Sequence, residues 1–188
     1  MSTMTTSAQS FLPYGRELTR ADLQSVPDDG YRYELIDGVL IVTPAPRVRH
    51  QRVLAQLVRI LQESVPSDLE VLFAPIDVVL ADNTVIQPDL LVAPHDAFTE
   101  TELPGPPLLA VEVVSPSTRS IDMLLKKERL QRAGCPHYWV VDPDEPSVIA
   151  WDLVDGSYVE VDRATGTETF EVEIPVRLRL TPDSLTEA

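Results

Sequence analysis

VIQPDLLVA at residues 85–93 and LLAVEVV at residues 108–114 are the two stretches that decide the fold. Each is a short apolar run with the length and composition of a buried strand. Each carries one carboxylate near its middle, Asp89 in the first and Glu112 in the second. A lone ionised carboxylate taken out of water costs several kcal/mol, so both acids need a partner.

A shared metal ion is the partner that the pattern favours. If the two strands are neighbours in one sheet, the pleat can point Asp89 and Glu112 the same way and bring their oxygens within reach of one ion. Hard oxygen ligands suit Mg²⁺ or Mn²⁺. The alternative is structural, with Asp89 capping a turn after Pro88 and Glu112 paired with an arginine. We favour the metal because acids in such environments cluster at functional sites.

The composition indicates one acidic globular domain. The chain has 188 residues, 44% of them hydrophobic, which is enough for a single core. The single cysteine, Cys135, excludes an internal disulfide and a thiol metal cluster. No stretch is apolar over the roughly 18 residues of a membrane helix, and the N-terminal segment lacks a signal-peptide core. We therefore expect a cytoplasmic protein that makes no membrane contact.

The net charge of -15 weighs against a nucleic-acid partner. Such a surface repels polyanions unless a local basic patch or a bound metal reverses the field. Arg47, Arg49, Arg52 and Arg59 form a basic concentration that is rare in this chain, on or near a helix expected over residues 47–64.

Residues 1–16 are expected to be disordered, residues 17–181 to form one domain and residues 182–188 to fray. A short helix is predicted over 19–23, and strands at 31–36 and 39–42 flank the hairpin turn Asp37-Gly38. Further strands are predicted over 69–73, 76–81, 137–141, 148–153, 158–161 and 170–174. A helix is predicted over 119–133, closed by Gly134, and a surface loop over 94–107. The unit 108–141 is long enough for a parallel crossover, which predicts a mixed sheet.

Three further residues are candidates for the site, each with an ordinary structural alternative. Glu34 lies on a hairpin strand, where it either faces solvent beside an arginine or faces the same point as the two acids. His50 is in the first turn of its helix, where a histidine is more often a core-edge residue than a base. Lys126 can reach back over the sheet, but Asp122 could pair with it on a solvated helix face, and Lys127 competes for the role.

An ordered set of motifs between Tyr33 and Pro143 covers well over half the chain. It comprises YELIDG at 33–38, the His50 helix, PD at 88–89, EVVSPST at 112–118, Asp122 with Lys126, Gly134, and YWVVDP at 138–143. This set resembles the Uma-two family of restriction-endonuclease-like proteins, within the PD-(D/E)xK nuclease superfamily. The superfamily usually places a lysine two residues after the glutamate, where this chain has Val114. Leu130 stands where the family commonly has tyrosine.

The resemblance implies a mixed α/β fold with a restriction-endonuclease-like core: a mixed sheet flanked by helices, with an N-terminal hairpin and C-terminal antiparallel strands. It also implies that Asp89 and Glu112, with the carbonyl of Val113, hold Mg²⁺ or Mn²⁺. Lys126 would assist as base or charge stabiliser. Glu34 would be a further acidic group, and His50 a family-typical position without an assigned role.

The expected function is that of a magnesium-dependent endonuclease that hydrolyses phosphodiester bonds of nucleic acid, with DNA the expected partner. Arg47, Arg49 and Arg119 could contact phosphates. A homodimer is expected because nucleases that cut both strands often pair. The aromatic residues Trp139, Trp151 and Tyr158 could serve that interface or the core.

Two other functions remain open. The first is a nuclease-like scaffold that no longer cuts and serves as a binding or interaction module, which the acidity favours. The second is a metal-dependent hydrolase of a small phosphoester, whose substrate would be repelled less.

Overall fold

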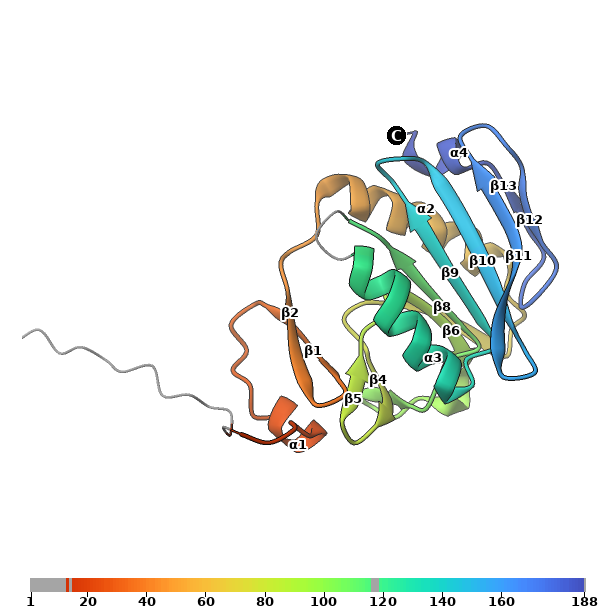
Figure 1. Cartoon of the computed structure of the whole chain (residues 1–188). Coiled ribbons are helices and arrows are strands. Elements are labelled where there is room, and N and C mark those ends of the chain that lie inside the picture. Colours follow the sequence, from red (N-terminus) through yellow and green to blue (C-terminus); the bar gives the residue numbers. More distant parts are fainter. Residues whose placement is uncertain (1–12, 14, 116–118, 188) are drawn as a thin grey trace, which may run out of the picture.

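The computed structural model describes residues 13, 15–115 and 119–187, and shows a mixed α/β fold (Figure 1). The disorder expected for residues 1–16 falls mostly on residues 1–12 and 14, which lie outside this range. The helical elements are α1 (Arg20–Leu23), α2 (Val48–Ser64), η1 (His95–Ala97), η2 (Ile121–Lys126), α3 (Lys127–Ala133) and α4 (Pro182–Thr186).

The larger sheet has six strands in the order β11-β10-β9-β8-β6-β3. Their bounds are β3 (Leu69–Phe73), β6 (Leu90–Pro94), β8 (Leu109–Val113), β9 (His137–Asp142), β10 (Ser147–Val154) and β11 (Ser157–Thr165). Neighbouring strands are antiparallel except β8 and β9, which run parallel and are joined through η2 and α3. The sheet is therefore mixed, as the crossover predicted.

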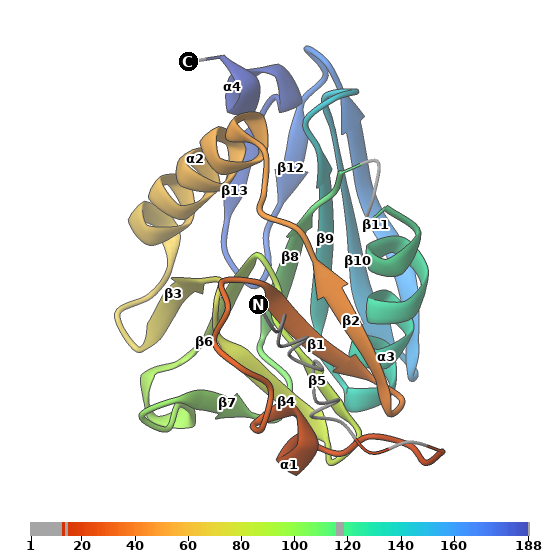
Figure 2. The same ribbon diagram turned by 90° about the vertical axis from the view of Figure 1, so that its left-hand side faces the viewer.

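Helices cover both faces of this sheet: α2 lies on one side and α3 on the other (Figure 2). The apolar stripe of α2 consists of Val53, Leu54, Leu57 and Leu61. It packs on alternate residues of the central strands, among them Leu90, Val111 and Trp139. The larger core of the domain therefore lies between α2 and the sheet.

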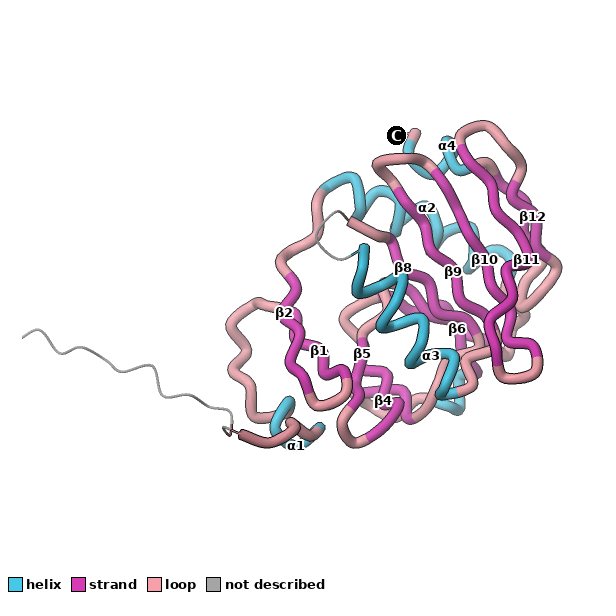
Figure 3. The backbone as a smooth tube through the Cα atoms, in the orientation of Figure 1, coloured by secondary structure: helices cyan, strands magenta, loops and turns pink. Residues whose placement is uncertain are grey.

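The smaller sheet has five strands in the order β2-β1-β5-β4-β7, and Figure 3 shows it beside the larger one. Its strands are β1 (Arg32–Ile36), β2 (Val39–Thr43), β4 (Asp77–Ala81), β5 (Thr84–Ile86) and β7 (Glu102–Pro104). Asp37 and Gly38 both have positive φ, 51° and 73°, which is the backbone of a type I′ turn. The predicted hairpin is confirmed.

The stretch 85–93 is not one strand, and that part of the prediction is wrong. It divides at Gln87-Pro88-Asp89 into β5, which pairs with β1, and β6, which pairs with β8. Proline donates no backbone hydrogen bond, so the ladder of β5 cannot continue through Pro88. Asp89 therefore lies where the chain passes from one sheet to the other.

The C-terminal end also differs from the expectation. Residues 170–174 contribute the short β12 (Phe170–Val172), which pairs with β13 (Leu178–Leu180). Residues 182–186 form α4 rather than a frayed end, because Leu185 is buried in the core beneath α2. Residues 94–107, expected as a plain loop, hold η1 and β7.

None of the helices in the described part of the chain is long and apolar enough to cross a membrane.

Candidate active site

Asp89 and Glu112 meet on one face of the larger sheet. Leu90 pairs with Val111 in the antiparallel ladder, so the next step of the register places Asp89 opposite Glu112. The two acids are 4% and 1% exposed, and the backbone N–H of Val113 donates to Asp89 Oδ2 at 2.9 Å. The prediction that the two strands are neighbours and point both carboxylates the same way is confirmed.

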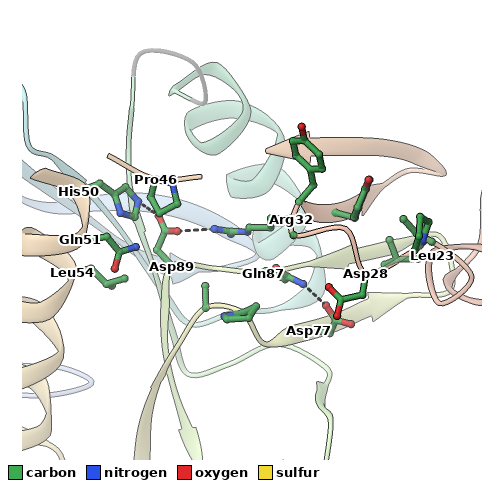
Figure 4. Close-up of a pocket in the computed structure, with 17 residues that line it drawn as sticks. Leu23, Asp28, Arg32, Pro46, His50, Gln51, Leu54, Asp77, Gln87 and Asp89 are labelled. Carbon is green, nitrogen blue, oxygen red and sulfur yellow. Dashed lines mark hydrogen bonds and ion pairs between the residues drawn. The ribbon is translucent and has the colours of Figure 1, made fainter. Parts of the chain in front are cut away.

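Asp89 is bound by two side chains from other elements. Arg32 Nη1, at the start of β1, donates to Oδ1 at 2.9 Å, and His50 Nε2 of α2 lies 3.1 Å from Oδ2 (Figure 4). Burial opposes ionisation, but the hydrogen bond from His50 and the charge of Arg32 outweigh it and hold the pKa of Asp89 well below its usual range. Asp89 is therefore an anion that other groups already compensate.

Glu112 shares a buried lysine with two other acids. Lys126 Nζ lies 3.1 Å from Glu112 Oε1, 2.9 Å from Glu34 Oε1 and 3.5 Å from Asp122 Oδ1. Lys126 is only 2% exposed, so the alternative of a solvated helix face is wrong. The π-helical turn η2 carries both Asp122 and Lys126, and such turns recur at functional sites.

Glu34 faces the site and not solvent. It is 1% exposed, and its Oε1 accepts the backbone N–H of Gln87 at 2.7 Å in addition to the Lys126 contact. Arg32 Nη2 is 3.6 Å from the same oxygen. Of the two options for this residue, the second is the one observed.

The cluster contains more negative than positive charge. Within the described residues, the carboxylates are Glu34, Asp89, Glu112 and Asp122, and the permanent cations are Arg32 and Lys126. Burial raises the pKa of Glu112 well above its ordinary value. Burial alone would lower the pKa of Lys126, but the carboxylates of Glu112, Glu34 and Asp122 outweigh it and raise that pKa. Among the described residues, four carboxylates of the cluster therefore face two permanent cations.

This arrangement fits a divalent cation in charge and in donor chemistry. Glu112 Oε2 is buried and has no hydrogen-bond partner within the described residues. Over the same part of the chain, no three His, Cys, Asp or Glu side chains are arranged as a ready metal-binding group. The physical reason is that Lys126 and Arg32 lie between the carboxylates, so a cation would bind to Glu112 Oε2 and compete with Arg32 for Asp89.

The cluster lies in the wall of a cavity of about 450 Å³. The predicted site residues that line it are Glu34, Arg47, His50, Asp89, Glu112, Val113 and Lys126. A molecule entering this cavity would therefore meet Asp89, Glu112, Lys126 and two arginines, Arg32 and Arg47, together.

Comparison with known proteins identifies the family. Residues 20–183 match the model of the Uma2 family, described as "Putative restriction endonuclease". The chain belongs to the Uma2 family. The resemblance drawn from the ordered motifs is thereby confirmed.

One solved structure is similar to this Uma2 chain throughout. It is a crystal structure of "a putative nuclease belonging to DUF820" from Anabaena variabilis ATCC 29413, with a TM-score of 0.71 and 17% identity. The similarity covers 90% of this chain and 97% of that one. At this identity it establishes the shared fold. No curated protein matches the chain.

The other predicted contacts lie outside the cluster. Arg49 is 3.6 Å from Asp144, and Arg119 is ion-paired with Asp142. The ammonium of Lys127 lies 3.6 Å above the centre of the Trp151 ring, so this lysine does not compete with Lys126.

The three aromatic residues considered for an interface belong mainly to the core. Trp139 and Trp151 are 1% and 5% exposed, and Trp139 packs edge-on against Phe170. Tyr158 is half-buried and donates its hydroxyl to the carbonyl of Cys135. The core alternative is confirmed for the two tryptophans, and dimerisation stays a prediction.

Sequence reasoning missed the role of Arg32. The alternation of a strand places residues two apart on one face, so Arg32 and Glu34 must point the same way. Two buried acids need a cation nearby, and Arg32 was the nearest arginine along that strand. The alternation of β1 therefore indicated that Arg32 points the same way as Glu34, but not that it reaches Asp89.

Proposed function

We propose that this Uma2 protein is a metal-dependent nuclease that hydrolyses phosphodiester bonds. The observation that carries the proposal is the buried Glu112 Oε2, which has no hydrogen-bond partner among the described residues. It belongs to a cluster of four carboxylates and two permanent cations that lines a cavity of about 450 Å³. The description of the family, and the nuclease assignment of the similar Anabaena protein, support the same reaction class.

Asp89 and Glu112, with the carbonyl of Val113, would hold Mg²⁺ or Mn²⁺. The ion, when bound, would lower the pKa of a water molecule and polarise a phosphate oxygen. Carboxylate and carbonyl oxygens are the ligands that these hard cations prefer.

The remaining residues orient these groups and offset charge. Glu34 and Glu112 hold the ammonium of Lys126 at 2.9 and 3.1 Å, where it would neutralise charge that develops on the phosphate. His50 and Arg32 fix the carboxylate of Asp89 from opposite sides. Arg47, at the cavity wall, would contact a neighbouring phosphate.

The test is cleavage of supercoiled DNA, single-stranded DNA and RNA in Mg²⁺ or Mn²⁺. Loss of a metal ligand or its support costs about 10- to 100-fold or more, so Glu112→Gln should lose cleavage by at least about that factor. Glu128→Gln, the same change at an exposed position of α3, is the matched control and should cut normally. Undiminished cleavage by Glu112→Gln contradicts the assignment.

An inactive nuclease-like module is the second candidate, and two observations favour it. Both oxygens of Asp89 already have partners in the protein, and the chain carries a net charge of -15. Calorimetric titration with MgCl₂ separates the two functions, because a module without metal chemistry should give no binding heat up to millimolar metal. Heat that disappears in Glu112→Gln favours the nuclease.

A further inference from the structure

A second cavity, of about 590 Å³, adjoins the active-site cavity. The two share Gly30, Arg32, Pro46, His50 and Asp89 as lining residues. Figure 4 shows Asp89 held between His50 and Arg32 at one side of this second cavity, with Gln87, Asp77 and Asp28 at the other. A chain molecule bound at the first cavity could therefore extend into the second.

The second cavity offers aromatic and apolar surface for a flat ligand. Tyr31 and Tyr33 line it and contact each other edge to face, with ring centres 6.5 Å apart. Tyr31 is 61% exposed, so its ring is accessible for stacking. Leu54 and Pro75 add apolar surface. The volume is in the range of about 300 to 1,000 Å³ that small-ligand pockets span.

The side of this cavity formed by Gln87, Asp77 and Asp28 presents hydrogen-bond acceptors (Figure 4). Gln87 Nε2 donates to Asp77 Oδ1 at 2.8 Å, which fixes the orientation of the amide. Gln87 Oε1 is then left buried without a partner among the described residues. The carboxylates of Asp28 and Asp77 also line the cavity. A ligand group that reaches this side of the cavity therefore meets an acceptor, Gln87 Oε1, which an N–H donor would satisfy.

We propose that this cavity binds one unpaired nucleobase that carries an exocyclic amino group, from the strand whose phosphate lies at the Asp89–Glu112 cluster. Cytosine, adenine and guanine present an amino donor, whereas uracil and thymine present a carbonyl oxygen at the position where cytosine has its amino group. The proposal rests on the proposed nuclease function and specifies its substrate class.

A base can enter such a cavity only when it is unpaired and unstacked. The preferred substrate is therefore single-stranded or locally unpaired nucleic acid. The net charge of -15 agrees with this preference. A duplex carries one negative charge per about 1.7 Å, twice the density of one strand, so the acidic surface repels a single strand less.

The binding test uses nucleosides, which contain no phosphate and need no metal. Cytidine and uridine differ at the 4-position, amino against carbonyl, and at N3, acceptor against N–H donor. They are titrated into ¹⁵N-labelled protein while amide resonances are followed by NMR. Cytidine should shift the side-chain amide of Gln87 and bind at least about threefold more tightly than uridine, as one added hydrogen bond predicts. Equal affinities, or no shift at the cavity with millimolar nucleoside, overturn the proposal.

Variants assign the binding to this cavity. Tyr31→Ala removes the exposed ring and should weaken cytidine binding, whereas Phe73→Ala, 52% exposed and outside both cavities, should not. Gln87→Met keeps the side-chain length and should abolish the preference for cytidine over uridine. Unchanged preference in Gln87→Met contradicts the role of its oxygen.

The outcomes separate this inference from the proposed function. Glu112 lines only the first of the two cavities, so Glu112→Gln should lose cleavage and keep cytidine affinity. Cytidine binding without any cleavage would refute the nuclease and leave the base-binding cavity. Cleavage without nucleoside binding, or faster cleavage of duplex than of single strands, would refute the cavity and leave the nuclease.

Discussion

Both faces of the six-stranded sheet are buried, but among the described residues only the face that α3 covers carries a cluster of charged side chains. In β8, Val111 and Val113 point to the α2 side and belong to its apolar core. The intervening Glu112 points to the other side and is just as buried, at 1% exposed. Adjacent residues of one strand thus belong to a purely apolar layer and to a cluster of charges.

The difference shows where this fold is stable by packing and where it depends on compensating charge. Apolar side chains on the α2 face stabilise the domain in proportion to the surface that they bury. Charges on the α3 face must be matched, because an unpaired buried ion costs several kcal/mol. On the second face, Glu112 Oε2 has no hydrogen-bond partner among the described residues, and both cavities described above adjoin its cluster.

The largest expected effect follows from removing the central cation of the charged face. Lys126→Met should destabilise the protein by about 3 to 5 kcal/mol, because the acids Glu34, Glu112 and Asp122 lose the ammonium that they share. Urea unfolding followed by circular dichroism measures the change.

Lys127→Met is the matched control for this loss. Lys127 lies on the ring of Trp151 and not among the acids, so its replacement should cost no more than about 1 kcal/mol. Equal losses of unfolding free energy in the two variants would mean that the contacts of Lys126 with the acids contribute no special stability.

On the apolar face, the free energy of unfolding should depend on side-chain volume and not on pH. Leu57→Ala should destabilise the protein by about 3 kcal/mol, because Leu57 of α2 is 1% exposed and its removal leaves a cavity. The loss should be the same from pH 5 to pH 8, since Leu57 belongs to an apolar cluster of the core. Leu124→Ala, at a position that is 67% exposed, should change stability by less than about 0.5 kcal/mol.

The sequence predicted the apolar face under α2 and the pairing of Asp89 with Glu112, but not the partners of these two acids. The spacing of Val53, Leu54, Leu57 and Leu61 reports burial directly, because a helical stripe is a local pattern. The pairing of Asp89 with Glu112 also followed, because two apolar runs with central acids are adjacent in sequence and pair most simply with each other.

The side chains that contact Asp89 and Glu112 could not be predicted from such local patterns. Arg32 reaches Asp89 across 57 positions of sequence, and the break at Pro88 determines that this contact joins two sheets. The spacing of Asp122 and Lys126 puts both on one face of a helix, but that local pattern does not show that this face is buried against Glu34 and Glu112. These features depend on how distant elements meet.

The two acids of the charged face should respond to pH with opposite signs. The pKa of Asp89 is lowered below its ordinary 3.8, so its contribution to stability is present above that pH and is lost as the pH falls. The pKa of Glu112 is raised above its ordinary 4.5, so its contribution is present below that pH and is lost as the pH rises through the folded pKa.

Replacing each carboxylate by its neutral amide tests the two opposite effects on stability. At pH 7, Asp89→Asn should destabilise the protein by about 2 kcal/mol, through weakened hydrogen bonds to a charged group. Glu112→Gln should stabilise it by about 1 kcal/mol, because the buried charge is removed. Below about pH 3.8 the Asp89→Asn difference should shrink, because the unfolded chain then takes up the proton that folded Asp89 resists, and the Glu112→Gln difference should already be gone below about pH 4.5. Thermal unfolding of the three proteins between pH 3 and pH 8 gives the curves, and differences of the same sign would refute the contrast.

The last prediction tests whether water is excluded from the apolar part of the α3 face, where Cys135 lies. Cys135 lies in the apolar cluster of that face, and burial raises the pKa of its thiol from 9.0 to about 11. The thiolate is the reactive form, so its fraction at neutral pH should fall about 100-fold. Iodoacetamide should therefore modify the folded protein at least about 100-fold more slowly than the protein unfolded in urea. Over the same incubation with iodoacetamide, the free energy of unfolding and the cleavage rate of the folded protein should not change. Rapid modification of the folded protein would show that water reaches this face generally, and the unpartnered Oε2 of Glu112 would then no longer mark its cavity as a functional site.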